Sequence, residues 1–117
     1  QTYKVLKTLQ VVKTKNMKLV IVTAVKEFQK DVLKLFKKAN IENFSSSNID
    51  GHKKGTSILM ASNWFSGEKI GNESSLFFSF TEDEYIEVLF HFIKEFNSNL
   101  ETNNPIKAVV VPIEKFI

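Results

Sequence analysis

The chain of 117 residues contains no cysteine and no arginine, and it has only two prolines and four glycines. The absence of cysteine excludes disulfide bonds, thiolate metal sites and a cysteine nucleophile. All sixteen basic residues are lysines. A lysine ammonium is a mobile point charge and cannot make the planar, two-pronged contact of a guanidinium. Functions that depend on an arginine clamp on phosphate or on guanine are therefore excluded.

Long hydrophobic runs are missing as well. The longest, residues 19–22 and 108–113, are far too short to span a bilayer. Residues 1–16 lack the apolar centre of a signal peptide, so the sequence predicts a cytoplasmic protein. We interpret residues 1–16 as an N-terminal extension or leader and residues 17–117 as one domain. The net charge of +3 is spread along the chain, which does not indicate a nucleic-acid partner.

The apolar residues predict strands and helices in the order βαββαβ. A continuous run rich in β-branched residues predicts a buried strand at 17–25, and helical spacing predicts a helix that ends at Asn40. Further strands are expected at 44–50, at 74–80 and from Ile106. Thr81 and Glu84 have the spacing of a capping box, which predicts the start of a second helix. The apolar stripe of this helix is expected to comprise Tyr85, Leu89, Phe92 and Phe96, flanked by Ile86, Ile93 and Leu100.

This order predicts an α+β, ferredoxin-like fold, with a four-stranded antiparallel sheet, two helices on one face and a long loop between the second and third strands. Strands 17–25 and 74–80 are apolar on both faces and are expected at the centre of the sheet. The serine-rich strand and the strand that carries Pro112 are expected at the edges, because proline removes a hydrogen-bond donor from the ladder.

On the first strand Leu19, Ile21 and Val25 point one way and Val20, Val22 and Ala24 the other, and on the third strand Phe77 opposes Leu76, Phe78 and Phe80. Two helices cover only one face of the sheet, so the other face would remain apolar. An exposed apolar patch of this size usually marks an interface. The face can be covered by the same sheet in other subunits of a closed homo-oligomer, or by residues 1–16 of the same chain. We expect the homo-oligomer.

The chain resembles the PII signalling proteins and their PII-like relatives. The resemblance covers residues 17–117, mostly as a pattern of elements, from the opening strand KLVIVTAV to the final strand AVVVPI. Its most specific part is GHKKG at 51–55, which is similar to the motif at the base of the PII T-loop, the segment that touches partner proteins. The resemblance implies a non-enzymatic homotrimer that binds a small effector between subunits, with an adenine nucleotide as the possible ligand, and that signals through this loop to a membrane transporter or an enzyme.

The resemblance also suggests which residues form the sites. The candidate ligand-binding residues are Ser45, Gly51, His52, Lys53, Lys54 and Gly55. The candidate partner-binding residues are Trp64, Phe65 and Lys69. The GHKKG turn can alternatively be a solvated loop, and Trp64 and Phe65 can alternatively pack against the protein's own core or a neighbouring subunit. No catalytic residue and no metal ligand is assigned.

The chain departs from the PII pattern where the phosphates would be held. The segment before the last strand, NLETNNP, has no glycine to let backbone amides approach a phosphate, and no arginine follows it. We therefore expect ATP to bind weakly. Three other functions remain open: a CutA-like trimer that responds to divalent metals, a small ferredoxin-fold enzyme and an RNA-binding domain. His91, with Glu87 and Glu95 at helical spacing, can hold a metal or belong to a solvated surface.

Overall fold

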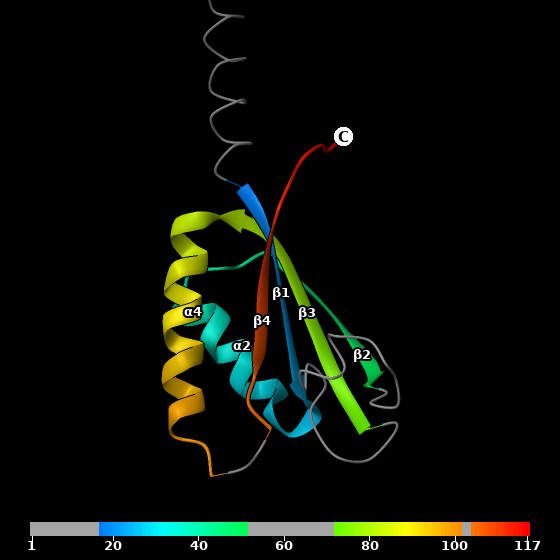
Figure 1. Ribbon diagram of the computed structural model, residues 1–117, viewed down its shortest axis with the longest axis vertical. Coiled ribbons are helices and arrows are strands. Elements are labelled where there is room, and N and C mark those ends of the chain that lie inside the picture. The colour runs from blue at the N-terminus through cyan, green and yellow to red at the C-terminus, as the bar shows by residue number, and fades with distance from the viewer. Residues whose placement is uncertain (1–16, 52–71, 102–103) are drawn as a thin grey trace, which may run out of the picture.

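The structure is a computed structural model, and it describes residues 17–51, 72–101 and 104–117 (Figure 1). The expectations for residues 1–16 and 52–71 therefore lie outside the described residues. The elements are β1 (Met17–Val25), a short 3-10 turn (Lys26–Phe28), α2 (Gln29–Lys38), β2 (Ser45–Gly51), β3 (Asn72–Glu82), α4 (Asp83–Ser98) and β4 (Lys107–Pro112). No helix in the described ranges is both long enough and apolar enough to cross a membrane.

The four strands form one antiparallel sheet in the order β2-β3-β1-β4. This arrangement confirms the predicted ferredoxin-like fold, with the two apolar strands at the centre. Pro112 pairs with Lys18 at the end of the edge strand β4, where the missing amide proton removes no interior ladder bond. β1 has the bounds that its apolar run predicts.

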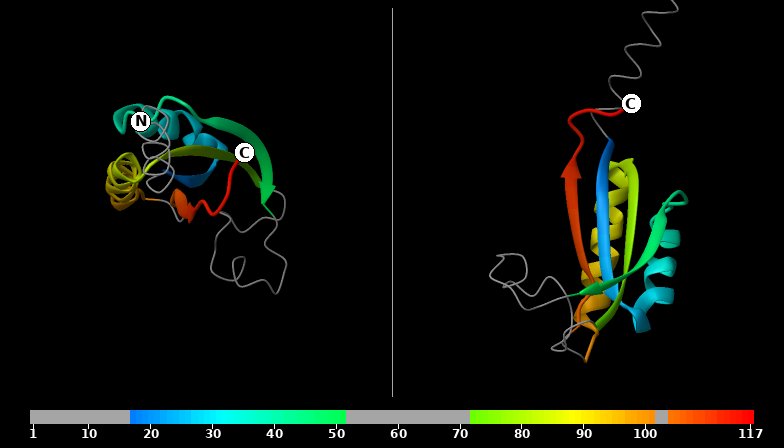
Figure 2. Two further views of the ribbon diagram at one scale, coloured as in Figure 1. Left: turned by 90° about the horizontal axis from the view of Figure 1, so that it is seen from above. Right: turned by 90° about the vertical axis from the view of Figure 1, so that its right-hand side faces the viewer.

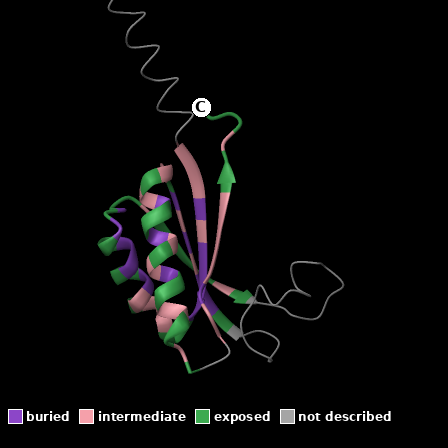
Figure 3. Cartoon of the chain, turned by 60° about the vertical axis from the view of Figure 1, so that its left-hand side comes forward, coloured by how far each residue is buried: buried purple, intermediate pink, exposed green. Residues whose placement is uncertain are grey.

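Both helices lie on the same face of the sheet, and the core fills the space between these two layers (Figure 2). Buried residues gather on the sides of α2 and α4 that face the sheet and along the middle of β1 (Figure 3). The sheet and both helices contribute to the core. Its least exposed residues are Val20, Val22 and Phe77 from the sheet, Val32 and Phe36 from α2, and Ile86 and Leu89 from α4. Burial of these side chains stabilises the layered arrangement.

The predicted capping box at Thr81 and Glu84 is wrong. Thr81 pairs with Lys18 inside the ladder between β1 and β3, so its backbone is still extended. Glu82 occupies the position before the helix, and its side chain makes no capping hydrogen bond. The acidic residues Asp83 and Glu84 lie in the first turn, where they interact favourably with the positive end of the helix dipole. Lys18 also contacts Asp83 at 3.1 Å.

The apolar side of α4 lies against the core, but its centre differs from the prediction. The predicted stripe residue Leu89 and the predicted flanking residues Ile86 and Ile93 are buried, whereas the aromatic residues of the stripe are half-buried. One of these aromatic side chains contacts the 3-10 turn that precedes α2: the ring of Phe96 meets the ring of Phe28 edge to face at 5.5 Å. Ile86, Leu89 and Ile93 thus belong to the buried core, and the larger aromatic rings pack against it from its edge.

Candidate functional site

The described surface includes three hollows of different volume. Pockets that bind small molecules usually have volumes of about 300–1,000 Å³. A hollow beside the start of β2 has about 460 Å³ and falls in this range. An apolar hollow at the end of β1 has about 270 Å³, and a polar hollow near Gly51 has about 160 Å³. The hollow beside β2 is therefore the candidate ligand site.

We call this site the Ser45 hollow, because it contains the one predicted ligand-binding residue whose side chain the structure describes. Two segments of the chain form it: the turn between α2 and β2, and the second half of β3. The lining residues are Glu42, Asn43, Phe44, Ser45, Phe78, Ser79 and Phe80. Ser45 and Phe78 are direct neighbours across the β2–β3 ladder, which brings the two segments together.

The turn between α2 and β2 has a defined local structure. Asn40 has a φ of 60°, the left-handed conformation that its predicted role as a helix stop requires. The amide of Ile41 donates a hydrogen bond to the carbonyl oxygen of Phe36 at 3.0 Å, and Ile41 is buried. These contacts direct the chain from the end of α2 toward the sheet. The turn is thus held by its own backbone, and Glu42 and Asn43 are exposed at its tip.

One hydrogen bond and two ring contacts fix the walls of the Ser45 hollow. The hydroxyl of Ser79 donates a hydrogen bond to the carbonyl oxygen of Asn43 at 2.5 Å, which joins β3 to the turn. The ring of Phe44 packs into the core at 4.8 Å from the ring of Phe36. On the other wall, the rings of Phe78 and Phe80 meet edge to face at 6.3 Å. The hollow therefore has one wall of turn residues and one aromatic wall.

The charge of the lining is negative. Among the described residues that line the hollow, Glu42 alone has an ionisable side chain, and none is a lysine or histidine. The other polar groups are the side chains of Asn43, Ser45 and Ser79, of which the Ser79 hydroxyl is already engaged with Asn43. The site can therefore donate and accept neutral hydrogen bonds and can contact a ring, but its described residues supply no positive charge.

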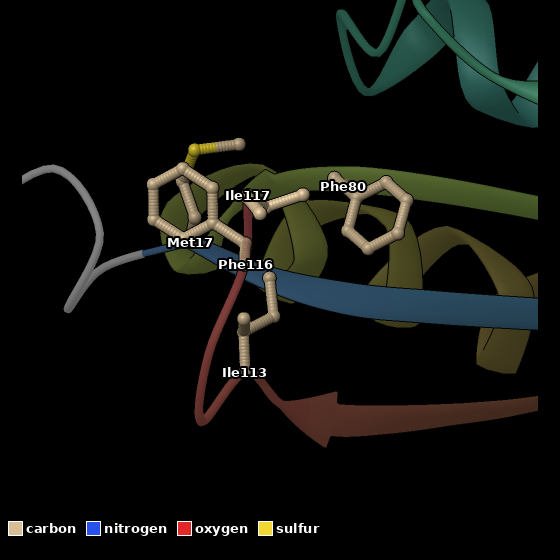
Figure 4. Close-up of a pocket in the computed structure, with 5 residues that line it drawn as sticks. All are labelled: Met17, Phe80, Ile113, Phe116 and Ile117. Atoms are coloured by element: carbon tan, nitrogen blue, oxygen red, sulfur yellow. The ribbon is translucent and has the colours of Figure 1, made fainter.

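The apolar hollow lies at the end of the sheet where β1 begins and β3 ends, and it shares Phe80 with the Ser45 hollow. Met17, Phe80, Ile113, Phe116 and Ile117 line it, and none of these side chains is polar (Figure 4). Phe116 is 71% exposed and lies in the segment that follows β4. Because the two hollows share Phe80, apolar surface continues from the Ser45 hollow to the C-terminal residues Phe116 and Ile117.

The polar hollow lies where β2 and β3 approach residues 52–71. Lys26, Asn48, Ile49, Asp50 and Glu73 line it. The Lys26 ammonium lies 3.2 Å from the Glu73 carboxylate, and both side chains are largely exposed. Asp50 is paired with Glu73 across the ladder, so two carboxylates face one lysine at this point. Exposed ion pairs of this kind contribute little to stability.

The other predicted site residues are mostly outside the described residues. This applies to His52, Lys53, Lys54 and Gly55 and to the partner-binding residues Trp64, Phe65 and Lys69. Gly51 is the last residue of β2 and pairs with Asn72. The structure thus separates Ser45 and Gly51, which lie at opposite ends of β2. The sequence analysis missed Glu42, Asn43, Phe78 and Phe80 as site residues, because no local pattern indicates that the turn lies beside β3.

His91 lies on the exposed side of α4. Its Nε2 atom is 3.7 Å from a carboxylate oxygen of Glu95, one helical turn away. Within the described ranges, no group of three or more histidine, aspartate and glutamate side chains is arranged to hold a metal ion.

No family model and no curated protein matches the sequence. Solved structures do match the fold. A nitrogen regulatory PII-like protein from Thiomonas intermedia, bound to ADP, AMP and bicarbonate, is 8% identical with a TM-score of 0.56, over 86% of this chain and 96% of its own. A DUF3240 family protein from Shewanella baltica is 15% identical with a TM-score of 0.60, over 86% of this chain and 93% of its own.

PII from Arabidopsis thaliana, bound to citrate, is 13% identical with a TM-score of 0.60, over 85% of this chain and 78% of its own. The agreement extends over most of each chain. At these identities the similarity is one of architecture. The chain has the fold of the PII-like signalling proteins.

Proposed function

We propose that the protein is a non-enzymatic, cytoplasmic regulatory protein of the PII-like type. Residues 17–117 form its domain and assemble as a homotrimer. A small effector binds at clefts between subunits and changes the state of residues 52–71. That segment then binds or releases a membrane transporter or an enzyme. The description of the Thiomonas protein as nitrogen regulatory supports a regulatory role over a catalytic one.

The observation that carries this proposal is the sheet face opposite α2 and α4, which we call the helix-free face. Its residues in the two central rows are Leu19, Ile21, Phe78, Phe80, Val109 and Val111. Ile21 is flanked by Phe78 and Val109, and Leu19 by Phe80 and Val111, so β1, β3 and β4 contribute only apolar side chains to these rows. On β2, Ser45 pairs with Phe78 at the edge of the sheet. Phe80 is 54% exposed and Val111 is 39% exposed. Apolar surface of this kind favours contact between copies of the chain in a closed oligomer.

The helix-free face and the Ser45 hollow share residues. Phe78 and Phe80 belong to both, so a second copy packed on the face would stand at the margin of the hollow. The hollow would then be a cleft between subunits. A ligand in such a cleft stabilises the assembled state, because it contacts groups that are together only there.

The position of the hollow also supports a link to residues 52–71. Ser45 begins β2, and Gly51 ends β2 directly before that segment. Phe78 lies on β3, whose first residue directly follows the segment. The Ser45–Phe78 pair is at the end of the β2–β3 ladder remote from this segment, so a ligand in the hollow would act on residues 52–71 through the length of the two strands. Such a ligand shifts the segment only if it binds one of its states better than the other.

The experiment is a thermal-shift screen of the full chain against adenine nucleotides, cyclic nucleotides, bicarbonate and divalent metals, combined with hydrogen exchange. A ligand that binds only the folded state raises the Tm by mass action. We expect at least one compound to raise the Tm and to change the exchange rates of residues 52–71. A compound that raises the Tm and leaves those rates unchanged would contradict the proposed signalling. A shift caused only by a divalent metal would favour the CutA-like function.

A further inference from the structure

We propose that the side of α2 and α4 that points away from the sheet, which we call the outer helix face, is a second contact surface between copies of this chain. In this contact α2 of each copy packs on α4 of the other, and opposite charges hold them together. The contact differs from the proposed trimer interface, which is apolar and lies on the opposite side of the sheet. It does not depend on the proposed function, because a monomer with this face would pair in the same way.

The two helices carry opposite charge. α2 contains four lysines and one aspartate, which gives it a net charge of +3. α4 contains four acidic residues and one lysine, which gives it a net charge of −3 when His91 is counted as neutral. The helices lie side by side, and the Lys38 ammonium lies 5.5 Å from the centroid of the Phe92 ring on α4. The outer helix face therefore has a basic half and an acidic half.

Both halves are open to contact. Their exposed charged residues are Lys30, Lys34 and Lys37 on α2 and Glu84, Glu87 and Glu95 on α4. Each half also has one exposed apolar residue, Leu33 at 40% and Val88 at 42%. The other large apolar side chains that are exposed in the described ranges belong to β3, to β4 or to the C-terminal segment. Each helix thus offers one apolar contact point among charges of a single sign.

Local interactions leave these charges unbalanced. Among the described residues, no lysine of α2 forms an ion pair, and neither does Glu84 or Glu87. Lys37 and Glu84 lie at helix ends that favour their charges, but Lys30 lies in the first turn of α2 and Glu95 in the last turn of α4, where the helix dipole disfavours them. Like charges three or four positions apart also repel one another within each helix. A surface of opposite charge would relieve this repulsion.

The arrangement of the helices determines how two copies meet. α2 and α4 run in opposite directions along the sheet (Figure 1). A two-fold axis along the helices places α2 of each copy antiparallel to α4 of the other, so unlike charges meet in both halves. When Leu33 lies opposite Val88 in this register, the next residue, Lys34, lies opposite Glu87 of the second copy. A two-fold axis across the helices would instead bring α2 onto α2, where the lysines repel.

The contact is small. A helix is about 10 Å wide and rises about 1.5 Å per residue, so α2 with 10 residues and α4 with 16 residues offer on the order of 400 Å² per copy. A standard interface buries about 800 Å² per partner, so this contact is transient and forms as the protein concentration rises. It joins homotrimers to one another, or monomers if the chain does not form the trimer.

Sedimentation velocity on the full chain, at increasing protein concentration and at two salt concentrations, tests the contact. Raising NaCl from about 0.1 M to about 1 M shortens the screening length from about 10 Å to about 3 Å. We expect larger species to appear with concentration at the lower salt and to disappear at the higher salt. The smallest species should be the same in both, because its interface is apolar. Association that persists at the higher salt, or no association at the lower salt, overturns the inference.

Charge reversals locate the contact. Lys34→Glu and Glu87→Lys are each expected to weaken the association by about tenfold, because a two-fold contact contains the altered pair twice. The variant that carries both changes is expected to restore it, since the unlike charges are exchanged. Lys115→Glu is the matched control: it changes the net charge as Lys34→Glu does, and Lys115 is exposed on the segment after β4. Equal weakening by Lys34→Glu and Lys115→Glu, or a double variant as weak as the single ones, contradicts the inference.

Discussion

The Ser79 hydroxyl donates a hydrogen bond to the carbonyl oxygen of Asn43, 36 positions earlier in the chain. This single contact joins the centre of the sheet to the turn after α2 and sets the spacing between the two walls of the Ser45 hollow. Ser79 is buried at 2% exposure, whereas Asn43 is exposed at the tip of the turn. The contact is therefore part-buried and lies at the margin of the hollow.

Ser79 has a counterpart on the same strand. Ser75 lies on the same face of β3, is 1% exposed, and its hydroxyl has no hydrogen-bond partner among the described residues. We expect Ser79→Ala to lower the free energy of unfolding by about 1 kcal/mol, since one hydrogen bond is lost. Ser75→Ala is expected to leave it unchanged or raise it by up to ~1 kcal/mol, because a buried polar group without a partner is removed. Urea unfolding at one fixed protein concentration measures both, and an equal loss in the two variants would contradict this difference.

A second pair of variants tests the junction between α4 and β4. The Asn97 side chain donates a hydrogen bond to the Ile106 carbonyl at 2.9 Å and accepts one from the Ile106 amide at 2.8 Å. Asn97→Ala is expected to lower the free energy of unfolding by about 1–3 kcal/mol, because two backbone groups next to the buried Ile106 lose their partner. The control is Asn99→Ala, which removes one exposed hydrogen bond to the Glu95 carbonyl at 3.2 Å. Its expected effect is below about 1 kcal/mol, and the account fails here if Asn99→Ala costs as much as Asn97→Ala.

The connection between β2 and β3 can be tested by hydrogen exchange on the free protein. The connection is far longer than the two to five residues that usually join hairpin strands, and it contains Trp64 and Phe65. We expect fast exchange across residues 52–71, with slower exchange after an effector is added. Strong protection of residues 57–65 in the absence of any ligand would instead show that this segment is a rigid part of the scaffold.

The fold could be predicted from the sequence because each element carries a local signal. Both ends of β1 could be predicted from its continuous apolar run. The end of α2 could be predicted from Asn40, because asparagine tolerates the positive φ that it adopts there. Other boundaries depend on pairing and could not be predicted locally. β3 extends to Asn72 and Glu82, beyond its apolar centre, because Gly51 and Met17 offer ladder partners at its two ends. The same extension placed Thr81 in the strand and removed it from the predicted cap.

The candidate site could be predicted only in part. Ser45 followed from the resemblance to PII proteins, and the structure places it in the hollow with the appropriate volume. Glu42, Phe78 and Phe80 become its neighbours through the β2–β3 register and the turn after α2, and these relationships have no counterpart in the order of residues. The negative charge of the hollow is likewise a property of which residues meet, and the overall charge of +3 gives no sign of it.

The helix-free face as the subunit interface is the central claim, and molar mass in solution tests it most directly. Light scattering on the full chain is expected to give three times 13.4 kDa. Val111→Asp places a charge on the helix-free face and should lower this mass, because a charge at the centre of an apolar interface is costly. Val88→Asp is the matched control, since Val88 is 42% exposed on α4, close to the 39% of Val111, and lies on the opposite side of the protein. The account predicts a trimer for the wild type and for Val88→Asp and a smaller species for Val111→Asp. A wild-type monomer, or a trimer that Val111→Asp leaves intact, would contradict it.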